Sequence, residues 1–253
     1  MESISELASD AGYTEQLVEF LISKCPAAIG KKEPAVPQFY GIPKIHKAPV
    51  KFRPIVPCHS SVQAPAGKYV SKKLKPIVER CKYVIKGTKH LAQLLSKTEL
   101  DPSRKVWIVS GDIEAFYPNI PLQEAIDLMM VFFDNHYRNA TPEDREIFRR
   151  CLVIANSHVI MDFQGKCYEQ LDGLAMGQAP SPDIANLWGA YFEEHAYDNN
   201  ADLHTSVVFY GRYIDDCLGI VYANSKEEAL SIMQKFRFDD PGKTRNTSLI
   251  KRS

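Results

Sequence analysis

Two adjacent carboxylates interrupt the most strongly β-forming segment of the chain. Residues 205–222 read TSVVFYGRYIDDCLGIVY, and Asp215 and Asp216 lie between two apolar halves rich in β-branched and aromatic residues. A tight turn at the acids predicts an antiparallel hairpin with both carboxylates at its tip. Two like charges at a rigid tip repel each other unless a cation neutralises them. The alternative is an ordinary Asp-rich turn, since Asp favours turns.

A third carboxylate ends another β-rich run. The segment KVWIVSGDI (105–113) contains Asp112 near its end, and Pro118 and Pro121 then reverse the chain. Taken alone, Asp112 could be a turn residue or a helix N-cap. With Asp215 it forms a pattern of a strand-end acid beside an acidic hairpin tip. Two Mg²⁺ ions about 3.5–4 Å apart, bridged by such acids, suit in-line phosphoryl transfer, and Mg²⁺ prefers hard oxygen ligands.

Composition narrows the class of protein. The chain has 253 residues and is 45% hydrophobic, which suffices for a buried core and excludes disorder or a fibrous repeat. No run of about 18 apolar residues predicts a membrane-spanning helix. Residues 1–10 lack the basic start and apolar stretch of a signal peptide. Six Cys without a C-x-x-C pair indicate reduced thiols in an intracellular protein.

The zero net charge conceals an asymmetry along the chain. Residues 31–90 carry 14 Lys and Arg against 2 acidic residues, and the remaining residues carry 17 basic and 29 acidic ones. The basic block therefore has a net charge of +12 and the remainder −12. This division indicates a polyanion bound on one side, and we expect the basic block to form one face adjoining the acids. The alternative is a solvated basic face.

Local patterns predict the order of helices and strands. Residues 31–60 contain six prolines, which exclude long helices and predict two extended arms, FYGIPKIH and KFRPIVP. A strand is expected at 105–113, with hairpins at 158–173, turning at Gln164-Gly165, and at 205–222. Apolar periodicity and capping residues predict helices at 13–24, 64–80, 88–98, 121–133, from 141 onward, at 181–196 and at 225–236.

Several motifs together resemble a known family. DIEAFYPNIP (112–121), GLAMGQAPSP (173–182) and YIDD (213–216) follow the order and spacing of motifs A, B and C of reverse transcriptases. Upstream, FYGIPKIHK (39–47) and RPIVP (53–57) resemble the fingers of Penelope-like retroelement polymerases. The resemblance covers roughly residues 37–236, and four motifs in order are far more specific than any one of them.

The resemblance implies an α+β fold, that of a right-hand polymerase. Fingers and palm would be present, with an antiparallel palm sheet flanked by helices and the thumb largely or wholly absent. The implied division is a helical lead-in at 1–36, basic fingers at 37–104, a palm with interleaved fingers segments at 105–236 and a frayed tail at 237–253.

The implied activity is that of an RNA-directed DNA polymerase of a retroelement. It would add dNTPs to the 3′-hydroxyl of a DNA primer on an RNA or DNA template, with two Mg²⁺ ions as cofactors and Mn²⁺ as a substitute. The resemblance makes Asp112, Asp215 and Asp216 catalytic metal ligands, with the Ile113 carbonyl as a further oxygen. Nuclear action, without a membrane partner, is implied by the same resemblance.

The resemblance also implies a nucleotide site. The ring of Tyr117 would leave no room for a 2′-hydroxyl and so favour dNTPs; a core aromatic is the alternative. Arg53 and, more weakly, Lys44 would contact the triphosphate. Gly177 lets the backbone approach the nucleotide. The family often carries Gln where Met176 stands here, so the role of that Gln would pass to Gln178.

A set of lysines is expected to contact the nucleic-acid backbone: Lys47, Lys51, Lys68, Lys72, Lys73 and Lys75. The alternative is that the lysines of this helix only face solvent and bind nothing. A second hypothesis for the whole chain is a truncated, catalytically weak or inactive nucleic-acid-binding remnant of such a polymerase. A third, an unrelated metal-dependent phosphodiesterase, lacks a His/Asp cluster and leaves the motif order unexplained.

Overall fold

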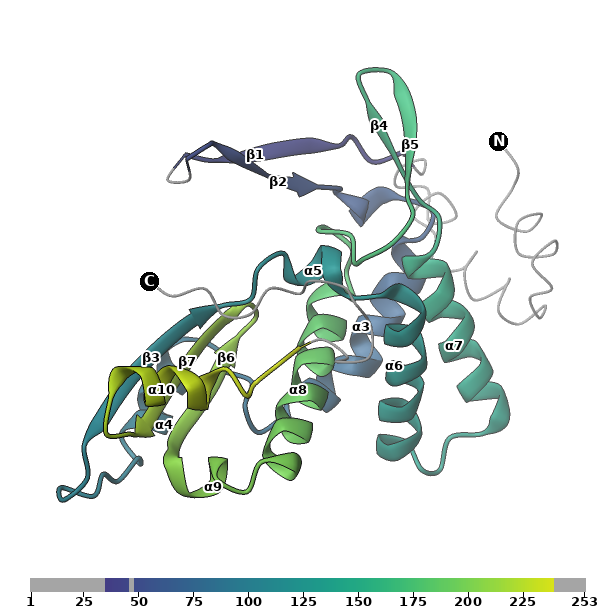
Figure 1. The fold of residues 1–253 in the computed structure, drawn as a ribbon. Helices are drawn as coiled ribbons and strands as arrows, with labels where there is room; N and C mark the ends of the chain where they lie inside the picture. Colours follow the sequence, from purple (N-terminus) through teal and green to yellow (C-terminus); the bar gives the residue numbers. More distant parts are fainter. Residues whose placement is uncertain (1–34, 46–47, 239–253) are drawn as a thin grey trace. The chain divides into compact units, whose positions relative to one another are not determined.

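The computed structural model describes residues 35–45 and 48–238. The helix expected at 13–24, Lys47 and the tail from 239 onward lie outside the described residues. The described residues fall into two compact units, one of residues 35–77 and 120–184, the other of residues 78–119 and 185–238. Each unit is thus built from two separate stretches of the chain, and Figure 1 follows them by colour.

In the first unit, the two proline-containing arms pair as antiparallel strands. Strands β1 (Tyr40–Lys44) and β2 (Lys51–Ile55) lie side by side (Figure 1). Their register aligns Ile42 with Arg53 and Lys44 with Lys51. Most of their side chains are exposed. The extended arms predicted from the proline spacing are confirmed, because proline is compatible with a strand that has no further partner on its N–H side.

The second strand pair of this unit is the hairpin predicted at 158–173. Strands β4 (Val159–Phe163) and β5 (Lys166–Gln170) are joined by Gln164 (φ +54°) and Gly165 (φ +76°). Positive φ at both turn residues is the geometry that matches the strand twist in a two-residue hairpin. The chain before β1 joins this hairpin, since the Phe39 N–H donates to the Asp162 carbonyl at 2.8 Å.

Helices α3 (Ala64–Val78), α6 (Leu122–His136) and α7 (Pro142–Asn156) form most of the remainder of this unit, with a short 3-10 turn at Cys58–Ser60. The rings of Phe133 and Phe148 stack 4.2 Å apart between α6 and α7. Thr141 is the N-cap of α7, where the sequence predicted a helix to start, and it forms a capping box with Asp144. The Tyr137 hydroxyl donates to the Lys73 carbonyl at 2.9 Å, which ties the end of α6 to α3.

The second unit is built on a three-stranded antiparallel sheet. Its order is β3 (Val106–Asp112), β7 (Asp216–Tyr222) and β6 (Val207–Tyr213). The helices of this unit are α4 (Thr88–Leu95), α5 (Phe116–Asn119), the greater part of α8 (Ser181–Asn199), α9 (Leu203–Ser206) and α10 (Lys226–Met233). The strand predicted at 105–113 and the hairpin predicted at 205–222 are confirmed.

One face of this sheet is covered by helices. Helix α10 packs closely on the sheet at Gly219, since an added Cβ there would lie 2.3 Å from the Met233 sulfur. Helix α8 packs closely at its own Gly189, where an added Cβ would lie 2.3 Å from the Arg212 guanidinium of β6. The Ser225 hydroxyl caps α10 by accepting the Glu228 N–H, and the Glu228 carboxylate accepts the Asn224 N–H rather than that of Ser225, so only half of a capping box forms. None of the helices in the described residues is long and apolar enough to cross a membrane.

Candidate active site

The sheet register brings the predicted acids to one end of one sheet. Strands β3 and β7 pair Asp112 with Asp216 as direct cross-strand partners. The Ile113 N–H donates to the Asp215 carbonyl at 2.9 Å, which joins the end of β3 to the hairpin tip. Because cross-strand partners project from the same face, Asp112 and Asp216 share the face opposite that of Cys217 and Gly219. Two segments far apart in the sequence thus supply neighbouring carboxylates.

The hairpin tip holds the backbone in a strained conformation. Tyr213 pairs with Asp216, so Ile214 and Asp215 form a two-residue turn. Ile214 has φ +57°, and Ala115, shortly after the end of β3, has φ +52°. The left-handed region costs a residue with a Cβ about 1–2 kcal/mol, and a β-branched residue there is an outlier. Such strain persists where the surrounding structure over-determines it, which is common at functional sites.

The negative charges at the tip act on one another. Asp215 is half-buried and Asp216 is exposed. Partial desolvation, together with the adjacent Asp215 carboxylate, raises the pKa of Asp216 above its ordinary value. A bound cation near the tip would favour the charged form of Asp216.

The oxygen donors at this end of the sheet fit Mg²⁺. They are the carboxylates of Asp112, Asp215 and Asp216 and the carbonyl of Ile113, all hard ligands. Within the described residues, no group of three or more His, Cys, Asp or Glu side chains is close enough together to hold a metal ion as it stands. Mg²⁺ typically takes one or two protein carboxylates and completes its shell with water and substrate phosphates. An open carboxylate site meets that requirement.

Tyr117 lies on the short helix α5, next to a buried ring. Phe116 is 6% exposed and its ring lies 6.1 Å from that of Phe238, edge to face. Tyr117 is only half-buried, with its ring 6.4 Å from that of Phe116. Of these two adjacent aromatics, Phe116 is therefore the core residue. The role of Tyr117 as a sugar-selecting residue stays a prediction.

The glycine-containing segment 173–182 packs inside the first unit. Gly177 has φ +126°, and a Cβ there would lie 2.1 Å from the Val56 carbonyl oxygen. The Val56 N–H donates to the Met176 carbonyl at 2.8 Å, so this glycine permits a close backbone approach. Gln178 is 3% exposed and donates to the Gln63 side chain at 3.4 Å. A contact between Gln178 and a nucleotide would require this side chain to leave its buried position.

Like charges face each other on the β1–β2 pair. Lys44 is directly opposite Lys51, and like charges in a cross-strand pair repel each other. Arg53 is exposed two residues farther along β2. The pair thus presents three cations within a short stretch of two adjacent strands, as a phosphate-binding surface requires.

The lysines of α3 divide into two groups. Lys68, Lys72 and Lys75 are exposed at helical spacings of four and three residues, so they follow one stripe of the helix. Lys73 is half-buried, with its ammonium 5.7 Å from the ring centre of Tyr69 and 5.0 Å from that of Tyr137. This cation–π packing distinguishes Lys73 from the other three lysines, although all four were predicted to contact the nucleic-acid backbone.

A comparison with protein families identifies the chain. Residues 42–238 match the family described as reverse transcriptase (RNA-dependent DNA polymerase). The chain belongs to this family. The matched range contains the motifs at 53–57, 112–121, 173–182 and 213–216, and it begins within the motif at 39–47. The predicted reverse transcriptase family is confirmed, and a search of curated proteins gives no match.

Solved polymerase structures share the fold of this reverse transcriptase domain. Telomerase from Candida albicans, in complex with a TWJ fragment of telomeric RNA, is 13% identical with a TM-score of 0.57, over 87% of this chain and 42% of that one. C-terminally truncated apo telomerase from Candida tropicalis is 11% identical with a TM-score of 0.53, over 88% and 52%. The BmCPV RNA-dependent RNA polymerase is 13% identical with a TM-score of 0.57, over 93% and 23%.

These similarities concern the fold alone, and the chain spans about half or less of the length of each of these structures. The predicted α+β fold of right-hand polymerases, with an antiparallel sheet and flanking helices, is confirmed.

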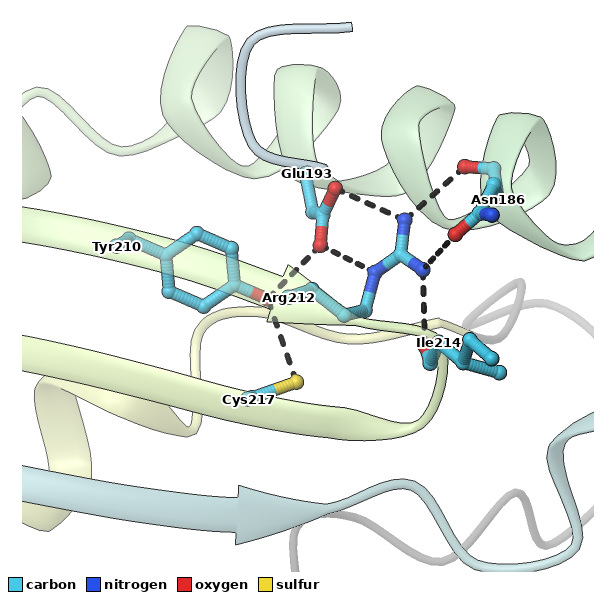
Figure 2. A network of polar contacts seen from close by, with 6 residues as sticks. All are labelled: Asn186, Glu193, Tyr210, Arg212, Ile214 and Cys217. Atoms are coloured by element: carbon cyan, nitrogen blue, oxygen red, sulfur yellow. Dashed lines mark hydrogen bonds and ion pairs between the residues drawn. The ribbon is translucent and has the colours of Figure 1, made fainter. Parts of the chain in front are cut away.

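Sequence reasoning missed one group of residues in this reverse transcriptase domain. Arg212, Glu193 and Asn186 form a buried polar network behind the hairpin tip (Figure 2). The available signal was an arginine inside the apolar run VVFYGRY, where a charged side chain has to find a buried partner. The partner could not be identified from spacing, since Glu193 lies on a helix 19 residues earlier.

Proposed function

We propose that this domain is the catalytic core of an RNA-directed DNA polymerase from a retroelement, related to the Penelope-like group. It adds dNTPs to the 3′-hydroxyl of a primer paired with an RNA template. The observation that carries the proposal is the register of β3 and β7, which sets Asp112 opposite Asp216 beside the strained Ile214–Asp215 turn. Family membership supplies the reaction class.

The chain's own residues have distinct tasks in this reaction. Asp112, Asp215, Asp216 and the Ile113 carbonyl would hold two Mg²⁺ ions, with Mn²⁺ as a substitute. When bound, the metals lower the pKa of the attacking hydroxyl and stabilise the pyrophosphate that leaves. The paired strands fix the acids on a rigid support, so little reorganisation is needed when charge develops in the transition state. The half-buried ring of Tyr117 excludes a 2′-hydroxyl.

The cations of the first unit serve the substrates. Arg53 and Lys44 contact the triphosphate, because a guanidinium fork can bind two phosphate oxygens at once. Lys51 and the stripe of Lys68, Lys72 and Lys75 contact the phosphates of template and primer. A retroelement polymerase would act in the nucleus. These assignments rest on the exposure of the side chains and on the family motifs.

Primer extension tests the proposal. The chain is incubated with a DNA primer on an RNA template, dNTPs and Mg²⁺, and extension is compared with that of Asp215→Asn. We expect dNTP-dependent extension that the variant loses. A parallel reaction with rNTPs separates DNA synthesis from RNA synthesis. Binding of primer–template without extension under any metal would instead support a non-catalytic nucleic-acid-binding remnant.

A further inference from the structure

Arg212 is a fully buried arginine whose donors are all used by the protein. It lies on β6, 0% exposed. Its Nε donates to Glu193 Oε1 at 2.6 Å, and its Nη2 donates to Glu193 Oε2 at 3.2 Å and to the Asn186 carbonyl at 3.0 Å. Its Nη1 donates to Asn186 Oδ1 at 3.2 Å and to the Ile214 carbonyl at 2.9 Å. Five hydrogen bonds match the five N–H donors of a guanidinium (Figure 2).

The partners of Arg212 are themselves fixed. Glu193 is 0% exposed, and it also accepts the Tyr210 hydroxyl at 2.9 Å. The backbone of Arg212 donates to the Tyr83 carbonyl at 2.8 Å and accepts from the Ile85 N–H at 2.7 Å. The guanidinium therefore connects helix α8, strand β6 and the hairpin tip through bonds that leave it little freedom to move.

The packing around the guanidinium is built for this side chain. A Cβ at Gly189, in the interior of α8, would lie 2.3 Å from Nη2. Glycine in a helix interior is less stabilising than alanine, but here it leaves the space that the Arg212 guanidinium occupies. The rings of Phe116 and Phe238 have their centres 5.7 and 5.9 Å from the Arg212 Cζ. Phe116 directly precedes Tyr117, so the same guanidinium also packs beside the proposed sugar-selecting segment.

Core filling alone does not explain a buried ion pair. Removing two charges from water is costly, and apolar residues of similar volume often stabilise a protein as well or better. Arg212 also donates a hydrogen bond to the Ile214 carbonyl, which an apolar residue at this position could not do. Ile214 is the left-handed residue directly before Asp215, so this bond fixes the peptide that orients the proposed metal ligand.

We infer that Arg212, held by Glu193 and Asn186, is a positioning residue that keeps the Ile214–Asp215 turn in its metal-binding conformation. The inference rests on the proposed function, since it assumes that the tip binds divalent metal. Loss of partners that orient a metal ligand typically lowers metal affinity or activity by about 10- to 100-fold. Loss of the Ile214 contact should have an effect of that order while the fold persists.

A charge-neutral double variant separates positioning from stability. Arg212→Met with Glu193→Gln removes both charges and leaves an amide oxygen to accept the Tyr210 hydroxyl. Removing one partner alone would strand a buried charge and could unfold the domain. Two further variants keep the charge pair: Arg212→Lys cannot make all five bonds, and Gly189→Ala displaces the guanidinium. The matched control is Arg145→Met with Asp134→Asn, which removes an exposed pair joined at 2.9 Å on α6 and α7.

Each variant of the full chain is measured for thermal melting, Mn²⁺ binding by electron paramagnetic resonance, and primer extension. We expect the folded variants at Arg212 and Gly189 to lose about 10- to 100-fold in Mn²⁺ affinity and in kcat, with KM for dNTP little changed. The control pair should match the wild type. If the double variant does not fold, Arg212→Lys and Gly189→Ala decide the question by the same readouts.

The outcomes distinguish the two proposals. Folded Arg212 variants that bind Mn²⁺ and extend like the wild type would overturn the positioning role and leave the polymerase proposal intact. A wild type that does not extend primers counts against the proposed function; Mn²⁺ binding that falls in both Asp215→Asn and the Arg212 variants then still supports positioning. Mn²⁺ binding unaffected by Asp215→Asn would overturn the metal site and the positioning role together.

Discussion

At the scale of single residues, Asp215 has two unusual neighbours. Ile214 before it is left-handed, and Asp216 after it carries the same charge. Both neighbours make the tip less favourable for folding than an ordinary turn, because the first strains the backbone and the second adds repulsion. Both are understandable if the tip serves a bound cation rather than stability.

We therefore expect Asp215→Asn to separate activity from folding. Primer extension should fall on the order of 10²-fold or more, as when one transition-state electrostatic contact is lost. The melting temperature should not fall, because the substitution removes a charge that raises the pKa of Asp216. Extension rates and thermal unfolding of the same preparation check this. Extension at the wild-type rate would exclude Asp215 as a metal ligand.

A second residue-scale prediction concerns the sugar. Tyr117→Val should raise incorporation of rNTPs relative to dNTPs, because Tyr117 is half-buried beside the core residue Phe116 and its ring would no longer occupy the space of a 2′-hydroxyl. Tyr117→Phe keeps the ring and serves as the control. The measurement is the ratio of kcat/KM for a dNTP to that for the matching rNTP. An unchanged ratio in an active Tyr117→Val enzyme would make Tyr117 a packing residue.

At the scale of helices and strands, local signals determined most of what could be predicted. Thr141 caps α7, and Gln164-Gly165 forms the turn between β4 and β5, because capping and positive-φ turns depend on a few adjacent residues. The strand-end position of Asp112 beside the acidic hairpin tip was predicted from the sequence, whereas its direct pairing with Asp216 is an observation of the sheet register.

The rest of the site depends on contacts between elements distant in sequence. Glu193 and Arg212 are joined only when α8 packs on β6, and Gly189 is explained only by the guanidinium that passes it. Lys73 differs from Lys72 because the rings of Tyr69 and Tyr137 lie beside it, although the helical period could have indicated that it leaves the exposed stripe. No composition or spacing rule reports such tertiary partners.

The β1–β2 pair yields a prediction at this scale. Arg53→Ala should raise the KM for dNTP with little change in the affinity for primer–template, because its proposed partner is the triphosphate. Arg53→Lys should rescue only in part, since an ammonium cannot reproduce the two-pronged contact of a guanidinium. Steady-state kinetics and a binding titration of the same variants check this. Weaker nucleic-acid binding with unchanged use of dNTP would assign Arg53 to the template instead.

For the whole molecule, the charge division should determine how binding responds to salt. The chain is neutral overall, with 31 basic and 31 acidic residues, yet its basic block should bind nucleic acid with strong salt dependence. Each phosphate contact contributes about −0.7 to −0.9 to the log–log slope. Replacing Lys68, Lys72 and Lys75 together by Gln should weaken the binding of all nucleic-acid sequences alike. It should also reduce the log–log slope of affinity against salt by about 2 to 3.

Lys73→Gln is the matched control on the same helix, because its ammonium packs over the rings of Tyr69 and Tyr137. It should lower the melting temperature without changing the slope. Binding titrations at several salt concentrations measure both effects. An equal loss of slope in the control would show that the exposed stripe of α3 has no special part in binding.

The left-handed backbone at Ile214 has a consequence for attempts to engineer the protein. Gly or Asn at this position would relieve the strain, so selection for heat resistance should favour them, with a gain of up to about 1–2 kcal/mol. A more flexible turn would orient the Asp215 carboxylate less well, so the selected variants should extend primers more slowly. Melting temperatures and extension rates of Ile214→Gly and Ile214→Asn would show whether a gain in thermal stability at this position lowers the rate of primer extension.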